Sequence, residues 1–291
     1  MAARRRVVVT GANGVVGRVL CASLTDEFDV VGVDLRRSGR KEISRVDMTR
    51  IRAAERALEG ADILIDLASA HWQQPWPKVR RNNIPAAWNA LEAARRQGVR
   101  RVLSASSNHV TGLYEWDEPY DRVVGGRYDG LDPAGIPKID TSMAVRPDSP
   151  YAVGKVMVEA AGRYYAESYG LSVFCLRIGS LNTAGRPTDV RHFATLITHG
   201  DMSRLVRSCI RAPADVPFRV FYGVSANTWR FWDIEDARRE IGYEPRDDAE
   251  AWRREFDARA GGTSRIAATR RRNSVRRLVP NRLRTFSGRL G

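Results

Sequence analysis

The sequence is poor in residues that build covalent or metal-held frameworks. It has three cysteines, Cys21, Cys175 and Cys209, and four histidines, and neither set shows the short spacing of metal ligands. The cysteines lie in apolar contexts, which predicts reduced core residues. The sequence therefore predicts no disulfide framework and no metal site.

Long apolar runs are also missing. No stretch approaches the roughly 18 residues of a membrane span. The basic start, Met1–Arg6, is followed by a β-branched run and a glycine turn rather than by the apolar region of a signal peptide. We therefore expect a cytoplasmic protein with no membrane span.

Acidic residues are absent from both ends of the chain. Three arginines precede Val7, and residues 264–291 hold nine arginines, which together account for nearly all of the net charge of +14. The body between the ends is nearly neutral. We predict a single domain over residues 1–263, with a substrate-binding portion from about residue 180, and a disordered basic tail over residues 264–291. Only this tail offers charge for nucleic acid or an anionic surface.

A glycine-rich turn lies near the start of the chain. The run Val7–Thr10 leads into Gly11, Gly14 and Gly17 at G-x-x-G-x-x-G spacing, and a helical pattern follows from Arg18 to Leu24. Glycines let a pyrophosphate approach backbone N–H groups at a helix start. An ordinary strand-to-helix turn can also hold glycines, but the next strand ends in Asp34, where a carboxylate can bind ribose hydroxyls. The combination predicts a dinucleotide site.

Strand and helix patterns alternate through most of the chain, which predicts an α/β fold with a doubly wound parallel sheet of the Rossmann type. Polar residues 36–45 form an expected loop. Expected helices cover residues 49–59, 84–97, 201–211 and 234–242, with one more starting at Pro150, and expected strands cover residues 63–68, 101–107, 171–178 and 218–222. Two segments break the rhythm, residues 113–149 and 182–191, and the first is long enough to be a lid.

A second motif carries chemistry. Ser149 and Pro150 suit the start of a helix, which places Tyr151 and Lys155 one turn apart on one face. An ammonium beside a phenol stabilises the phenolate, which can take a proton from a substrate hydroxyl as hydride leaves. A solvated helix face often produces Y-x-x-x-K, but the dinucleotide turn and a strand ending in Ser106 and Ser107 favour the catalytic interpretation.

These motifs resemble the extended short-chain dehydrogenase/reductase superfamily, within it the NAD-dependent epimerase/dehydratase family. Thr10-Gly11-x-x-Gly14-x-x-Gly17, Asp34, Ser107 and Tyr151-x-x-x-Lys155 match its pattern in order and spacing. Within the family, the chain is most similar to hexuronate dehydrogenases and NAD-dependent glucose-6-phosphate dehydrogenases. Three stretches carry this similarity: Ser106-Ser107-Asn108-His109, Arg177-Ile178-Gly179-Ser180 and Tyr222–Asn227. The resemblance implies NAD as cofactor and a homodimer.

The resemblance also implies roles for individual residues. Ser107 would orient the reacting hydroxyl, Tyr151 would be the base, and Lys155 would bind the nicotinamide ribose. The cofactor would further be bordered by Gly11, Asn13, Gly14, Val16, Gly17, Asp34, Leu35, Asp47, Met48, Leu67, Ala68, Ser69 and Asn83. Substrate would contact His71, Ser107, Asn108 and His109, while Ser180 and Arg191 would hold the far, anionic end of a sugar.

We therefore predict an NAD-dependent dehydrogenase that oxidises an anionic monosaccharide, a hexuronate or a hexose phosphate, at its anomeric carbon to a lactone. A phosphate would need more donors, which Arg122, Arg127, Lys138, Arg186 and His192 could supply. Arginines at 36 and 37 leave NADP open. The alternatives are a nucleotide-sugar epimerase or dehydratase, which would want a larger carboxyl-terminal part, and a non-catalytic Rossmann sensor with an anion-binding tail.

Overall fold

The computed structural model describes residues 4–40, 42–70, 74–213 and 215–259. His71 and the predicted tail, residues 264–291, lie outside this described part of the chain. Within it, no helix is long and apolar enough to cross a bilayer.

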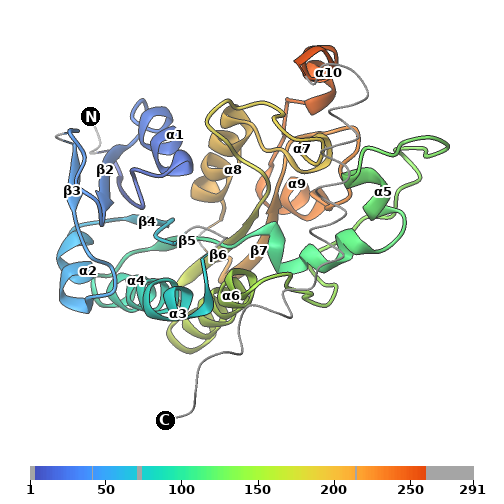
Figure 1. Cartoon of the computed structure of the whole chain (residues 1–291). Helices are drawn as coiled ribbons and strands as arrows, with labels where there is room; N and C mark the ends of the chain where they lie inside the picture. Colours follow the sequence, from blue (N-terminus) through green and yellow to red (C-terminus); the bar gives the residue numbers. More distant parts are fainter. Residues whose placement is uncertain (1–3, 41, 71–73, 214, 260–291) are drawn as a thin grey trace, which may run out of the picture.

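Seven parallel strands form one sheet in the order β3-β2-β1-β4-β5-β6-β7 (Figure 1). The strands are β1 (Arg6–Thr10), β2 (Asp29–Asp34), β3 (Ile43–Arg45), β4 (Ile63–Asp66), β5 (Arg101–Ala105), β6 (Ser172–Ile178) and β7 (Phe218–Gly223). The strand order changes direction between β1 and β4, where ligands of such sheets bind at the carboxyl ends of the strands.

Helices cover both faces of the sheet, as Figure 1 shows. One face carries α1 (Val15–Ser23), α8 (His199–Arg211) and α9 (Glu235–Ile241), and the other carries α2 (Ile51–Ala57), α4 (Ile84–Arg96) and α6 (Pro150–Tyr169). The central strands β1, β4 and β6 are mostly apolar because both of their faces are covered. The predicted doubly wound parallel sheet is confirmed.

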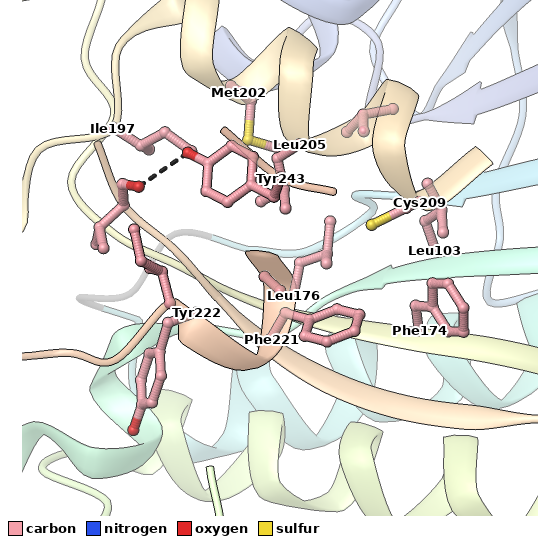
Figure 2. Packing of buried hydrophobic residues seen from close by; sticks show 14 of the residues in the cluster. Leu103, Phe174, Leu176, Ile197, Met202, Leu205, Cys209, Phe221, Tyr222 and Tyr243 are labelled. Carbon is pink, nitrogen blue, oxygen red and sulfur yellow. Dashed lines mark hydrogen bonds between the residues drawn. The ribbon is translucent and has the colours of Figure 1, made fainter. Parts of the chain in front are cut away.

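Each face of the sheet has its own hydrophobic core. Figure 2 shows part of the core under α8, where Met202, Leu205 and Cys209 lie above Leu176 and Phe221 of the strands. Tyr243 closes this core, and its hydroxyl donates to the carbonyl of Val224 at 2.8 Å (Figure 2). Burying the tyrosine ring therefore leaves its polar end satisfied.

Several predicted boundaries shift by one to a few residues. α1 starts earlier than expected, α2 is shorter at both ends, and α4 and α9 lose their last predicted residue. The helix expected from residue 201 begins at His199, because the Thr198 side chain accepts from the backbone N–H of Asp201 and caps it. The prediction of a polar loop over residues 36–45 is wrong at its end. The edge strand β3 lies there, and its Ile43 side chain is buried.

The long segment between η2 (Asn108–Trp116) and α6 is folded into the body rather than left as an open lid. It contains α5 (Tyr120–Val124), and its apolar side chains join the core on the α8 side. Ile139 is held on both sides, because its N–H donates to Phe231 at 2.7 Å and its carbonyl accepts from Asp233 at 2.9 Å. The remaining short helices are α3 (Trp76–Lys78), η1 (Val79–Asn83), α7 (His192–Thr195), η3 (Ala249–Trp252) and α10 (Arg253–Arg259).

Candidate active site

The glycine turn between β1 and α1 has the geometry that its sequence predicts. Gly11 has a φ of +63°, and a Cβ there would lie 2.8 Å from the carbonyl oxygen of Leu67. A Cβ on Gly17 would meet the backbone of Gly11 and Ala12. Gly14 caps α1 without any side-chain hydrogen bond. The turn is therefore compact, and the start of α1 presents backbone N–H groups to a phosphate.

Thr10 fixes the chain after β4 against this turn. Its hydroxyl donates to the Asp66 carboxylate at 2.6 Å and accepts from the N–H groups of Leu67 and Ala68, each at 3.0 Å. Burial raises the pKa of Asp66, against the lowering effects of the Thr10 hydrogen bond and of Lys155. The predicted cofactor residues Leu67 and Ala68 thus lie beside Gly11.

Asp34 ends β2 and is 7% exposed. Its two carboxylate oxygens accept from the backbone N–H of Asn13 and of Arg36, each at 2.9 Å. The Arg36 guanidinium lies 3.6 Å from the same carboxylate and is itself mostly exposed. Leu35 is exposed beside them. Asp34 therefore joins the glycine turn to the loop after β2, at the place expected for the adenosine ribose.

The other predicted cofactor residues line the same edge. Met48 is buried, and hydrogen bonds from Thr49 hold the pKa of Asp47 below its usual range. Asn83 accepts from the N–H of Ala70 at 2.8 Å, whereas its buried Nδ2 has no acceptor among the described residues. The backbone donors, the Asp34 carboxylate and this orphaned amide together match the polar groups of a dinucleotide, so the residues present fit NAD.

Tyr151 and Lys155 lie on the first turns of α6. Ser149 caps this helix by accepting from the N–H of Ala152 at 3.2 Å. Lys155 is 5% exposed, and its ammonium donates to the carbonyl of Ala105 at 2.6 Å and lies 5.6 Å from the centroid of the Tyr151 ring. The lysine is therefore tied to the end of β5 while facing the tyrosine.

Ser107 caps η2, and its hydroxyl accepts from the N–H of His109 at 3.2 Å. The His109 ring lies edge-on to the Tyr151 ring, with centroids 6.4 Å apart. His109 Nδ1 lies 2.5 Å from a carboxylate oxygen of Asp148. Asn108 is buried beside them, and its Nδ2 has no partner among the described residues. The structure thus brings the predicted Ser-Ser-Asn-His segment to the Tyr-Lys helix.

A buried network of hydrogen bonds adjoins the Ser-Ser-Asn-His segment and the Tyr-Lys helix. We did not predict it from the sequence. Glu159 of α6 accepts from the Ser106 hydroxyl at 2.5 Å and from two nitrogens of Arg177 at 2.9 Å each. Arg177 donates on to the Tyr222 hydroxyl at 3.2 Å, which pairs with Thr111 at 2.9 Å. The i+4 spacing of Glu159 from Lys155 was the available signal.

Ser180 and Arg191, both predicted to hold the far end of a sugar, lie in contact with each other. The Arg191 guanidinium donates from Nη1 to the Ser180 hydroxyl at 3.0 Å. The structure adds an unpredicted partner, Glu115 at the end of η2, which accepts from Arg191 Nε at 2.7 Å and from Nη2 through its other oxygen. Nothing local in the sequence marks Glu115, since its partner lies 76 residues away.

Comparisons with known proteins assign the chain to a family. The sequence profile of the NAD dependent epimerase/dehydratase family matches residues 7–211. The chain belongs to this family. The predicted cofactor, NAD, and the predicted family are therefore confirmed.

Similar proteins narrow the class of enzyme. Uronate dehydrogenase of Pseudomonas syringae pv. tomato is 30% identical over 87% of this chain and 86% of its own. Two Haloferax volcanii enzymes are each 32% identical over 84% of this chain, NAD-dependent glucose-6-phosphate dehydrogenase over 94% of its length and L-arabinose 1-dehydrogenase (NAD(P)(+)) over 97%. The structure of glucuronic acid dehydrogenase from Chromohalobacter salexigens matches with a TM-score of 0.76 and 30% identity, over 90% of this chain and 91% of that one. The predicted class, an NAD-dependent oxidoreductase, is confirmed.

Proposed function

We propose that this protein oxidises a sugar at its anomeric carbon to a lactone, with NAD as hydride acceptor. The observation that carries the proposal is the position of the Tyr151 ring, which lies near the buried ammonium of Lys155 and edge-on to the His109 ring. The Lys155 ammonium is held at the carboxyl end of β5 by the carbonyl of Ala105. The similar proteins support the proposal, since they are named as dehydrogenases of acidic and of neutral sugars.

The residues divide the reaction between them. Tyr151 Oη takes the proton from the anomeric hydroxyl, while Ser107 Oγ orients that hydroxyl and Lys155 places a positive charge near the Tyr151 ring. NAD, when bound, supplies the nicotinamide that accepts hydride from the anomeric carbon. Loss of one hydride and one proton leaves a carbonyl in the ring, which is a lactone. Asn108 and His109 hold neighbouring sugar hydroxyls.

A nucleotide-sugar epimerase is the weaker candidate. After β6 the described chain holds one further strand, β7, and only short helices besides α8, so the portion from about residue 180 leaves little structure for a nucleotide. A dehydratase would also want an acid next to the catalytic serine, where this chain has Asn108 and His109. We place the substrate-binding portion there and expect a monosaccharide.

The test is NADH formation by the full-length protein with a panel of sugars. Glucuronate, galacturonate, glucose 6-phosphate, glucose and arabinose should include at least one that is oxidised, with the lactone detected before it hydrolyses. Turnover of a nucleotide sugar without net NADH formation, and of no free sugar, would favour the epimerase instead.

We further propose a cytoplasmic homodimer. All three cysteines are free thiols, which suits a reducing compartment. α4 and α6 pack side by side and expose large apolar side chains, among them Trp88, Met157 and Tyr164. Such a patch on adjacent helices suits a two-fold contact. Light scattering should give the mass of two chains for the wild type and of one chain for Trp88→Glu. A wild type with the mass of one chain would rule the dimer out.

A further inference from the structure

The guanidinium expected to hold a substrate anion is already occupied by the protein. Arg191 uses Nε and Nη2 for the two oxygens of Glu115, and Nη1 for the hydroxyls of Ser180 at 3.0 Å and Thr195 at 3.5 Å. Its Cζ lies over the Trp232 ring, 5.8 Å from the centroid. The two nitrogens that could bind a substrate carboxylate side by side, Nε and Nη2, therefore already bind the carboxylate of Glu115.

Glu115 is the more deeply buried member of this ion pair. The side chain of Glu115 is 8% exposed and that of Arg191 is 21% exposed. Burial alone would lower the pKa of Arg191, but Glu115, helped by Asp148 and Asp189, raises it above its usual range. A substrate carboxylate would have to displace Glu115, leaving a buried charge uncompensated, or join three carboxylates around one cation.

The other cations that could bind a phosphate are engaged elsewhere. Arg186 pairs with Glu255 at 2.7 Å and Lys138 donates to the carbonyl of Arg230 at 2.7 Å. Arg127 pairs with Asp121, and Arg122 donates to the carbonyl of Asp129. Burial lowers the pKa of His192 to about 4, so its ring is neutral near pH 7. Four of these five side chains are thus engaged within the protein, and the fifth is uncharged near pH 7.

We propose that Glu115 determines specificity, and that its carboxylate makes this site select a neutral aldose over a hexuronate or a hexose phosphate. The inference rests on the proposed function and differs from the anionic substrate expected from the sequence. Glu115 occupies on Arg191 the place that a substrate carboxylate would take. Its negative charge repels an acidic sugar, whereas a sugar hydroxyl can donate to it.

The decisive measurement is kcat/KM with NAD for matched sugar pairs that differ only at the far end, glucose against glucuronate and galactose against galacturonate. Wild-type protein should favour the neutral member of each pair by about tenfold or more, since like charges placed together cost several kcal/mol. A wild type that favours the uronates would overturn the inference without any variant. Inactivity toward all free sugars would instead overturn the proposed function, and the inference with it.

The variant arm tests Glu115 itself. Glu115→Gln keeps the shape and one acceptor for Arg191 but removes the charge, so the ratio of uronate to neutral-sugar kcat/KM should rise by about tenfold or more. Glu118→Gln, an exposed acid three residues along the same segment, is the matched control and should leave the ratio unchanged. An unchanged ratio in folded Glu115→Gln protein would show that the pair only supports the structure.

Discussion

The Asp148 carboxylate lies 2.5 Å from Nδ1 of His109 and joins η2 to the start of α6. A proton on Nδ1 lets the ring donate to this carboxylate. A Cβ on Gly112 would collide with the same carboxylate. Asp148 thus helps to hold the position of a ring that lies edge-on to Tyr151.

Replacing Asp148 by Asn should lower kcat/KM by about tenfold, because a hydrogen bond to a charged group, worth about 1.5–3 kcal/mol, becomes one to a neutral amide, worth about 0.5–1.5 kcal/mol. The free energy of unfolding should change far less. Steady-state kinetics and urea unfolding measure the two effects. Asp132→Asn, an exposed acid in the same long segment, serves as control. Wild-type kinetics in Asp148→Asn would show that His109 needs no such support.

Tyr151→Phe should abolish turnover while leaving the affinity for NAD nearly unchanged, because only the hydroxyl is removed and Lys155 stays in place. General-base catalysis contributes about a hundredfold or more. Kinetics and NAD titration check both halves of the prediction, and Tyr169→Phe, exposed at the end of the same helix, is the control. Turnover above about a tenth of the wild-type value would remove Tyr151 as the base.

NAD should be preferred over NADP, because the Asp34 carboxylate would repel a 2′-phosphate. Asp34→Ala should raise KM for NAD by about ten- to a hundredfold and shift the preference toward NADP, since charged hydrogen bonds of about 1.5–3 kcal/mol are lost and Arg36 is released. Kinetics with both cofactors decide this, with Asp29→Ala at the exposed start of β2 as control. If wild type favours NADP and Asp34→Ala changes little, Arg36 and Arg37 set the preference.

Stability should fall on mild acidification because of His192. Burial, reinforced by Arg191 and opposed by Asp189, lowers its pKa from 6.5 to about 4. Between these values the unfolded chain binds a proton that the folded chain does not, so the contribution is complete above pH 6.5 and is lost as the pH falls toward 4. The slope is at most about 1.4 kcal/mol per pH unit.

Urea unfolding at several pH values checks this prediction. His192→Gln cannot titrate, so its free energy of unfolding should fall less than that of wild type between pH 7 and pH 5. Parallel pH profiles for the two proteins would show that His192 does not carry the effect.

The sequence predicted the parts of the fold and site that are encoded locally. The apolar run before Gly11, the acid at the end of β2 and the cap before Tyr151 each define their own geometry, and Gly242 ends α9 with a φ of +65°, as a glycine stop predicts. The sheet followed from the alternation alone.

The parts that were missed depend on contacts between distant segments. β3 has only three residues, too few for a period. The long segment after η2 looks like a loop because its apolar residues follow no helical or strand period, yet Ile139 packs into the core through hydrogen bonds to a strip 92 residues later in the chain. Glu115 has no local signature, and only the folded chain shows that it meets Arg191.

The anchoring of Ile139 between Phe231 and Asp233 also orders events at the ribosome. The strands that surround the cofactor turn are complete once β5 has emerged, but the two hydrogen bonds of Ile139 to Phe231 and Asp233 cannot both form until residue 233 has been made. At about 5–20 residues per second, the wait lasts several seconds or longer. The strands beside the cofactor turn are therefore synthesised well before the last backbone contacts that hold the long segment can form.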